Sequence, residues 1–267
     1  MVQSVITVIV GSLLLCSSVV AGEVVKLDAN ESRPFLSPSL AKDGMVGEII
    51  HAASAAAGIE SQIIYKPLKR MIENDSNNDL GNPMFFMNNQ DFSAVVPLAV
   101  YHVSLFYYRP KHGHAHEIVS VESLKDHRVG LLSGTLVNRS AFKRAGIVFE
   151  ESYAHASLFR KLHKGRLDVV IEVDLVGRAF IQDLFPEEVE NFGVTRMPQS
   201  ASPIALNMAV NQPEAAALAA RYREGLRKIR ESGEYRAILQ KYYGEQIPAD
   251  YEQQLDRFGY IYQEVSQ

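Results

Sequence analysis

Short apolar segments of strand type and helix type alternate along most of the sequence, and this alternation limits the possible folds more than any other feature. In the middle of the chain, expected strands at 128–132, 148–149 and 168–173 alternate with expected helices at 136–145, 154–164 and 175–184. Gly146 and Gly165 follow two of the helical segments, as expected at helix ends. Because parallel strands need a long crossover, usually a helix, this order predicts parallel sheets covered by helices. The predicted fold class is therefore α/β.

The same alternation of strand-type and helix-type segments continues toward both ends of the chain. Strands are expected at 23–27, 61–65, 84–87, 103–108 and 204–210, and helices at 46–58, 68–74, 213–232 and 234–243. Pro213 comes at the start of the long helix, where the first turn tolerates a proline.

Composition excludes several classes of partner. The chain has 267 residues, of which 47% are hydrophobic, with a formal net charge of −4 and scattered Lys and Arg. We find no basic face for a nucleic acid and no polybasic membrane patch. The length is enough for one large domain or for two smaller lobes.

The first 22 residues carry no charged side chain and have an apolar core at 5–15, which is too short to cross a bilayer. The segment ends in small residues, with Val19 and Ala21 at the −3 and −1 positions of a cleavage site. This pattern predicts a signal peptide at 1–22 and export across the inner membrane to the periplasm. The alternative is an uncleaved membrane anchor. Lipid attachment at Cys16 is not expected, because Leu15 occupies a position that requires a small residue.

Cys16 is also the one cysteine of the chain. The mature protein would therefore lack a thiol for catalysis or for zinc binding. Although His112, His114 and His116 alternate in a loop-like segment, we expect no functional metal site and no cofactor.

Five segments in this order resemble the solute-binding proteins of polar amino acid ABC importers, which have the type II periplasmic binding fold. They read DGMVGEIIHAASAAAG at 43–58, SLKDHRVGLLSGT at 123–135, KGRLDVVIEVD at 164–174, the strand at 204–213, and SGEYRAILQKYYG at 232–244. The resemblance implies two lobes, each with a mainly parallel sheet flanked by helices. Lobe one would span 23–101 plus 204–267 and lobe two 102–203. A ligand would bind in the cleft between them and hinge closure would bury it.

The resemblance also suggests ligand-binding residues in lobe two. Gly134 and Thr135 lie between a strand and a helix, where free backbone N–H groups suit a carboxylate. The local alternative is that Thr135 only caps its own helix. The family places an Asp that pairs with the ligand ammonium where this chain has Val173, so Glu172 or Asp174 would have to take that role. The alternative is a solvated strand end.

In lobe one the chain departs from the family. The Arg that normally binds the ligand carboxylate is missing, and the matching segment contains Met87, Asn88 and Asn89. Either another group, such as Arg33 or Arg70, holds the carboxylate, or the ligand is not an ordinary α-amino acid. Asn88 and Asn89 would suit a neutral or sugar-like ligand, with plain loop positions as the alternative. Phe35 matches an aromatic residue that stacks over the ligand, with a core position as the equal alternative.

These features predict an extracytoplasmic protein, expected to be monomeric, that captures a small polar and amino-acid-like ligand for an ABC permease. The alternative is a ligand sensor of the same fold that docks on a membrane receptor. An enzyme is less favoured, because the sequence has no Gly-x-Ser-x-Gly, no phosphate-binding glycine loop and no His-Glu-x-x-His.

Overall fold

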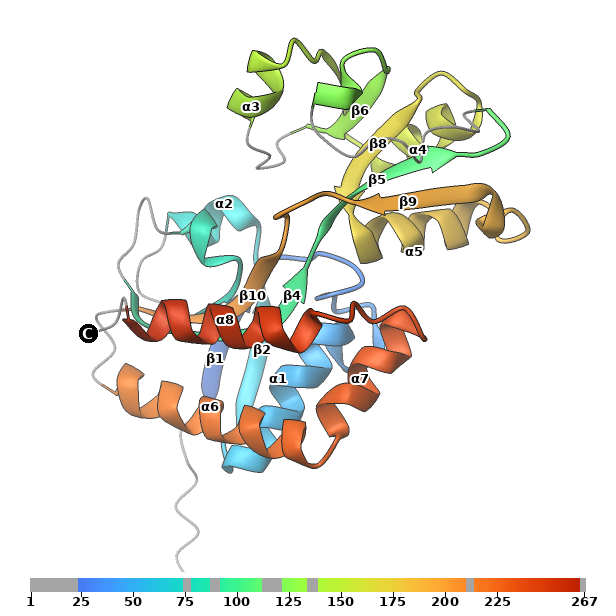
Figure 1. Cartoon of the computed structure of the whole chain (residues 1–267). Coiled ribbons are helices and arrows are strands. Elements are labelled where there is room, and N and C mark those ends of the chain that lie inside the picture. The colour runs from blue at the N-terminus through green and yellow to red at the C-terminus, as the bar shows by residue number, and fades with distance from the viewer. Residues whose placement is uncertain are drawn as a thin grey trace, which may run out of the picture.

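The computed structural model describes residues 24–73, 78–86, 92–111, 122–133, 139–209 and 214–264. These residues form two bodies, one above the other in Figure 1, each built around its own β-sheet. None of the described helices is both long enough and apolar enough to cross a membrane.

The lower body contains a five-stranded sheet in the order β2-β1-β3-β10-β4. The strands are β1 (Val25–Ala29), β2 (Ser61–Tyr65), β3 (Asn78–Gly81), β4 (Phe92–Tyr101) and β10 (Ser202–Ala209). β1 pairs in parallel with β2 and β3, whereas β10 runs antiparallel to β3 and β4. β4 therefore runs in the same direction as β1.

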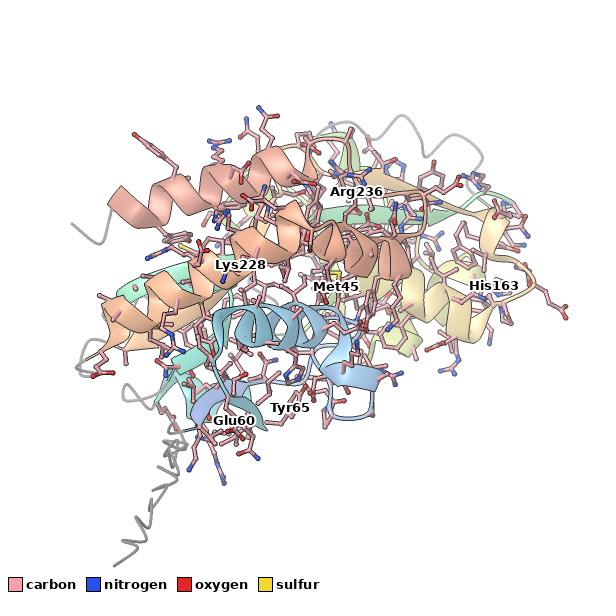
Figure 2. All side chains as sticks on the ribbon, turned by 90° about the horizontal axis from the view of Figure 1, so that it is seen from below. Met45, Glu60, Tyr65, His163, Lys228 and Arg236 are labelled. Carbon is pink, nitrogen blue, oxygen red and sulfur yellow. The ribbon has the colours of Figure 1, made fainter. Side chains whose placement is uncertain are left out.

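Helices cover this sheet and fill its core. They are α1 (Gly44–Ala57), α2 (Leu68–Ile72), α6 (Ala215–Glu231), α7 (Glu234–Tyr243) and α8 (Tyr251–Glu264). Figure 2, which views the molecule from below, shows α6 with Lys228 running alongside α1 with Met45. Gly225 makes this approach possible, because a Cβ there would lie 2.1 Å from the Ala53 carbonyl oxygen. On the other face of the sheet, Tyr262 of α8 packs with Val95 and Ala205.

The upper body contains a second five-stranded sheet in the order β7-β6-β8-β5-β9. Its strands are β5 (Val103–Tyr108), β6 (Val129–Leu132), β7 (Phe149–Ser152), β8 (Val169–Val173) and β9 (Phe192–Arg196). Its helices are α3 (Arg139–Arg144), α4 (His155–His163) and α5 (Asp174–Leu184). Alternate residues face opposite sides, so Leu105 and Ile171 enter one apolar cluster while Phe106 and Val170 enter another.

Three buried tyrosines form hydrogen bonds with backbone groups on the outer side of β4. β4 is the last strand of its sheet, so polar backbone groups on its outer side have no neighbouring strand. The Tyr235 hydroxyl donates to the Leu98 carbonyl at 2.9 Å, and the Val100 N–H donates to the Tyr251 hydroxyl at 2.9 Å. The Tyr243 hydroxyl donates to the Val100 carbonyl at 3.4 Å. The C-terminal helices thus hold β4 in place up to the point where it leaves the lower body.

The expected two-lobed α/β fold is confirmed, but both sheets are mixed rather than mainly parallel. The reason is the crossing strands. β4 leaves the lower sheet and β10 returns to it, so the two must run in opposite directions. In the upper sheet β5 enters against the direction of β8.

Several expected elements differ from the structure. The start of the strand expected at 84–87 instead belongs to a 3-10 turn, η2 (Pro83–Phe85), in which the Asn82 side chain accepts from the Met84 N–H. The strand lies earlier, as β3, in a segment that reads as polar. β4, β9 and α8 were not expected. The remaining 3-10 turns are η1 (Ala41–Asp43), η4 (Glu122–Leu124) and η5 (Val189–Asn191).

Replacing Tyr251 with Phe should destabilise the protein by about 1–3 kcal/mol, because the buried Val100 N–H loses its acceptor. Tyr243→Phe should cost less, since its hydrogen bond is longer. Urea unfolding followed by circular dichroism measures both. Tyr153→Phe, at a side chain that is 94% exposed, is the control and should change nothing. Equal stability of the Tyr251 variant and the wild type would show that the edge needs no such acceptor.

Candidate functional site

In both sheets, the edge formed by the carboxyl ends of the parallel strands lies at the junction between the bodies. In the lower sheet β1, β2, β3 and β4 all run toward this edge, and β4 ends there at Tyr101. In the upper sheet Val103, the first residue of β5, pairs with Val173, the last residue of β8. The single residue His102 therefore connects the carboxyl-end edges of the two sheets. We call them the lower edge and the upper edge.

A second connection returns beside the first. The Met197 N–H donates to the Val103 carbonyl at 3.0 Å, and the Ser200 hydroxyl donates to the same carbonyl at 3.0 Å. The chain then enters β10 at Ser202, which pairs with Tyr101. Ligands of open α/β sheets bind outside the carboxyl ends of the strands, so these edges are the candidate site.

The upper edge contains two buried carboxylates that both have partners. Glu172, the fourth residue of β8, is 6% exposed, and its Oε2 lies 2.7 Å from Nδ1 of His155 in α4. Asp174, the first residue of α5, is 8% exposed, and its Oδ1 accepts from Nε of Arg178 at 2.5 Å. Both residues are predicted ligand-binding residues, and both lie at the carboxyl end of β8. A contact with a ligand remains a prediction.

The start of α5 also contacts the lower body. Leu175 and Val176 belong to the same buried apolar cluster as Tyr243 of α7. Nearby, Arg196 of β9 pairs with Asp250, which precedes α8, at 3.1 Å. Burial lowers the pKa of His102, and the Arg196 charge lowers it further, against the opposing effect of the Asp250 and Asp174 carboxylates. A polar junction thus joins the bodies beside the connecting residue.

The lower edge places Phe35 and Arg70 differently. Phe35 is 3% exposed, belongs to the lower apolar core, and lies 6.3 Å from the Tyr101 ring. This position favours the packing interpretation of Phe35. Arg70 lies on α2, directly after β2, and is exposed. The Asn82 amide donates to the Tyr101 hydroxyl at 2.8 Å, a contact at this edge that the sequence did not indicate.

Five predicted ligand-binding residues, Met87, Asn88, Asn89, Gly134 and Thr135, lie outside the described residues, as do His112, His114 and His116. Within the described ranges, no group of three His, Cys, Asp or Glu side chains is arranged to hold a metal ion.

The buried carboxylate of Asp79 lies on β3, the central strand of the lower sheet. Asp28 of β1 pairs in register with Asp79 of β3, and Lys66 binds Asp28 at 2.6 Å. Asp79 is fully buried, and neither of its carboxyl oxygens has a hydrogen-bond partner in the described part of the chain. Burial, together with the nearby Asp28 charge, raises the pKa of Asp79 to about 8, against a smaller opposing effect of Lys66. Asp79 is therefore mostly protonated at neutral pH.

A groove of about 440 Å³ lies away from both edges, between α6, β4 and α8. Val96, Pro97 and Leu226 contribute apolar surface to it. Two of its arginines are neutralised, Arg227 by Glu224 and Glu231 and Arg230 by Glu252 and Asp256. We assign no ligand to this groove.

No model of a known protein family matches the sequence, and no curated protein sequence matches it. Solved structures do match the fold. One is a histidine kinase sensor domain with similarity to periplasmic binding proteins, at 18% identity and a TM-score of 0.62, covering 83% of this chain and 96% of that one. Another is an ancestral cationic amino acid solute-binding protein, at 16% identity and a TM-score of 0.63, covering 82% and 95%.

A third is the arginine-, lysine-, histidine-binding protein ArtJ from Geobacillus stearothermophilus, at 16% identity and a TM-score of 0.59, covering 85% of this chain and 98% of that one. These similarities establish the two-lobed periplasmic-binding-protein-like fold. At such low identities they carry no information on the ligand.

The Asp79 carboxyl should make stability depend on pH. Its pKa is higher in the folded state than the ordinary value of 3.8, so the folded state keeps a proton that the unfolded chain releases. The stabilisation is complete below about pH 4 and is lost as pH rises toward about 8, with a slope of up to ~1.4 kcal/mol per pH unit. Asp79→Asn should remove this slope.

Unfolding free energies between pH 5 and pH 8 measure the effect. Asp183→Asn, at an exposed position on α5, is the matched control and should keep the wild-type slope. Parallel pH profiles for wild type and Asp79→Asn would mean that Asp79 is already ionised in the folded protein.

Proposed function

We propose that this chain is an extracytoplasmic solute-binding protein that captures a small polar ligand between its lobes and delivers it to an ABC importer without chemical change. The observation that carries the proposal is the arrangement of the two edges. Two separately packed sheets turn their carboxyl ends toward one junction, which two short connections cross in the described chain. Bending of these connections would move one edge toward the other.

The proposed mobile units are lobe one, residues 23–101 plus 204–267, and lobe two, residues 102–203. The apolar clusters support this division, because two of them contain residues of lobe two alone and the large cluster takes only the start of α5 and its neighbours from lobe two. The start of α5, which packs on the lower body, would act as the contact about which lobe two turns.

The proposed ligand contacts combine both edges. Gly134 and Thr135 follow β6 on the upper edge, and Arg70 follows β2 on the lower edge. Met87, Asn88 and Asn89 follow η2 and complete the proposed set in lobe one. Residues 1–22 would act as the signal peptide, and the mature protein would be a periplasmic monomer.

A sensor is the second candidate function, because one of the similar structures is a histidine kinase sensor domain. The two candidates differ in the membrane partner rather than in the fold. Affinity capture of the mature protein on membranes that contain either an ABC permease or a sensor kinase would separate them. We propose no enzymatic activity, so recovery of the bound solute unchanged is expected.

A small polar solute should raise the melting temperature, because it binds only the folded state. At about 100 times its Kd the stabilisation is about 2.7 kcal/mol, which corresponds to roughly 5–10 °C for a chain of this size. A thermal-shift screen over amino acids, organic acids, amines and small sugars measures it. If no small solute shifts the transition, the binding function is wrong.

Replacing Thr135 with Leu should weaken binding of the solute found in that screen roughly tenfold, or about 1.4 kcal/mol, by blocking access to the turn. The melting temperature without ligand should stay near the wild-type value. Ser140→Leu, at an exposed position on α3, introduces the same side chain as a control and should leave binding unchanged. Wild-type affinity of the Thr135 variant would remove this turn from the site.

A further inference from the structure

At the upper edge, both carboxyl oxygens of Glu172 already have a partner within the protein. Its Oε1 accepts from the Val173 N–H at 2.8 Å, and its Oε2 is held by His155 at 2.7 Å. The His155 ring is in turn stacked on Phe180, with ring centroids 4.8 Å apart and planes at 22°. Both carboxyl oxygens are thus engaged and the side chain is buried. A ligand ammonium would have to share these oxygens with their internal partners to bind Glu172.

Asp174 is engaged in a similar way. Its carboxylate binds Arg178, and its backbone N–H donates to the His102 carbonyl at 2.9 Å. The next acid and base at the junction, Asp250 and Arg196, also bind each other. Asp174 and Asp250 therefore each face a guanidinium of this chain, whereas Glu172 faces the His155 imidazole. A ligand ammonium would gain little by competing with an arginine at 2.5 Å.

The lower edge differs from the upper edge, because it contains two arginines without a partner in the described chain. Arg33 follows β1 and Arg70 follows β2, and both are exposed. Among the described residues, neither guanidinium forms an ion pair or a side-chain hydrogen bond. β1 and β2 are neighbours, with Ala29 opposite Tyr65, so both arginines extend from the same end of adjacent strands.

Two lysines of this edge have carboxylate partners. Lys66 binds Asp28 at 2.6 Å, and Lys69 lies 3.8 Å from Glu73. Arg33 and Arg70 are therefore the guanidiniums of this edge with free donors in the described chain, beside the exposed ammonium group of Lys42.

Two acids of this edge also have partners. Glu31 accepts from the Ser37 hydroxyl at 2.5 Å, and Asp43 lies 2.9 Å from Nε2 of His51. Neither binds an arginine. The edges thus combine free guanidinium donors with carboxylates that are already bound.

We propose that the ligand is a small organic carboxylate without an ammonium group, held by Arg33 and Arg70. This inference rests on the proposed function and names the class of solute for the same site. Guanidiniums bind carboxylates through two parallel hydrogen bonds, which accounts for the use of arginine here. A ligand ammonium would find only carboxylates that internal partners already occupy.

Glutarate and L-glutamate test the proposal, because they have the same carbon chain and two carboxylates and differ by the α-ammonium group. Calorimetric titration of the full mature protein should show at least tenfold tighter binding of glutarate. L-Lysine, with two ammonium groups, should bind still more weakly. Sodium sulfate serves as the probe for nonspecific anion binding.

Arg33→Gln and Arg70→Gln should each weaken glutarate binding at least tenfold without changing the melting temperature of the free protein. Arg166→Gln is the matched control. Arg166 is exposed and precedes β8, at the opposite end of the upper sheet, so its loss should leave the affinity unchanged.

The outcomes separate the two proposals. Tighter binding of L-glutamate or L-lysine than of glutarate would overturn this inference and leave the binding function intact. Sulfate binding as tight as that of glutarate, with the same dependence on Arg33 and Arg70, would show an adventitious ion only and would also overturn it. If no solute of any class binds, both the inference and the proposed function fail.

Discussion

The free edge of β4 is the constraint on which the rest of the structure depends. A strand at the border of a sheet exposes backbone groups that must find partners once helices cover it. Here Tyr235, Tyr243 and Tyr251 supply those partners, and all three come from the C-terminal helices. β4 is consequently held rigidly up to Tyr101, one residue before the chain enters the other lobe. The connection at 197–201 runs back beside His102, so the bending that we propose between the lobes would fall on these two connections.

The charged side chains also fall into two sets, those held by partners within the protein and those available to a ligand. Several carboxylates are deeply buried, and most of them have a partner that comes from another element. Glu48 of α1 binds Lys241 and Tyr242 of α7. Burial is the largest single effect on its pKa and raises it, but the Lys241 and Tyr242 contacts together outweigh burial and lower the pKa. Glu172 binds His155 of α4. Such pairs stabilise the contact between elements and leave few acids free for a ligand.

Local patterns predicted much of the fold. β2 and α7 have the predicted boundaries, because their apolar periodicity and their limits, such as Gly244, are local signals. The segment around β3 could not be predicted, since its polar residues are buried by neighbouring strands rather than by their own pattern. β9 pairs only along one side, with β5, and its sequence carries little apolar alternation.

The candidate site was less predictable than the fold. The sequence placed Glu172 and Asp174 at a strand end but could not show that His155 and Arg178 bind them, because those contacts depend on how α4 and α5 pack. Phe35 illustrates the same point: whether an aromatic residue stacks on a ligand or fills a core is decided by the tertiary environment.

The distance between the lobes tests the central claim most directly. Met84 on η2 and Tyr153 after β7 are 62% and 94% exposed and lie at the lower and upper edges. Spin labels on Met84→Cys and Tyr153→Cys, in protein produced without residues 1–22 and hence without the native Cys16, would report this distance by pulsed electron paramagnetic resonance. The account predicts a shorter and narrower distance distribution when the stabilising solute is bound. Identical distributions with and without bound solute would contradict it.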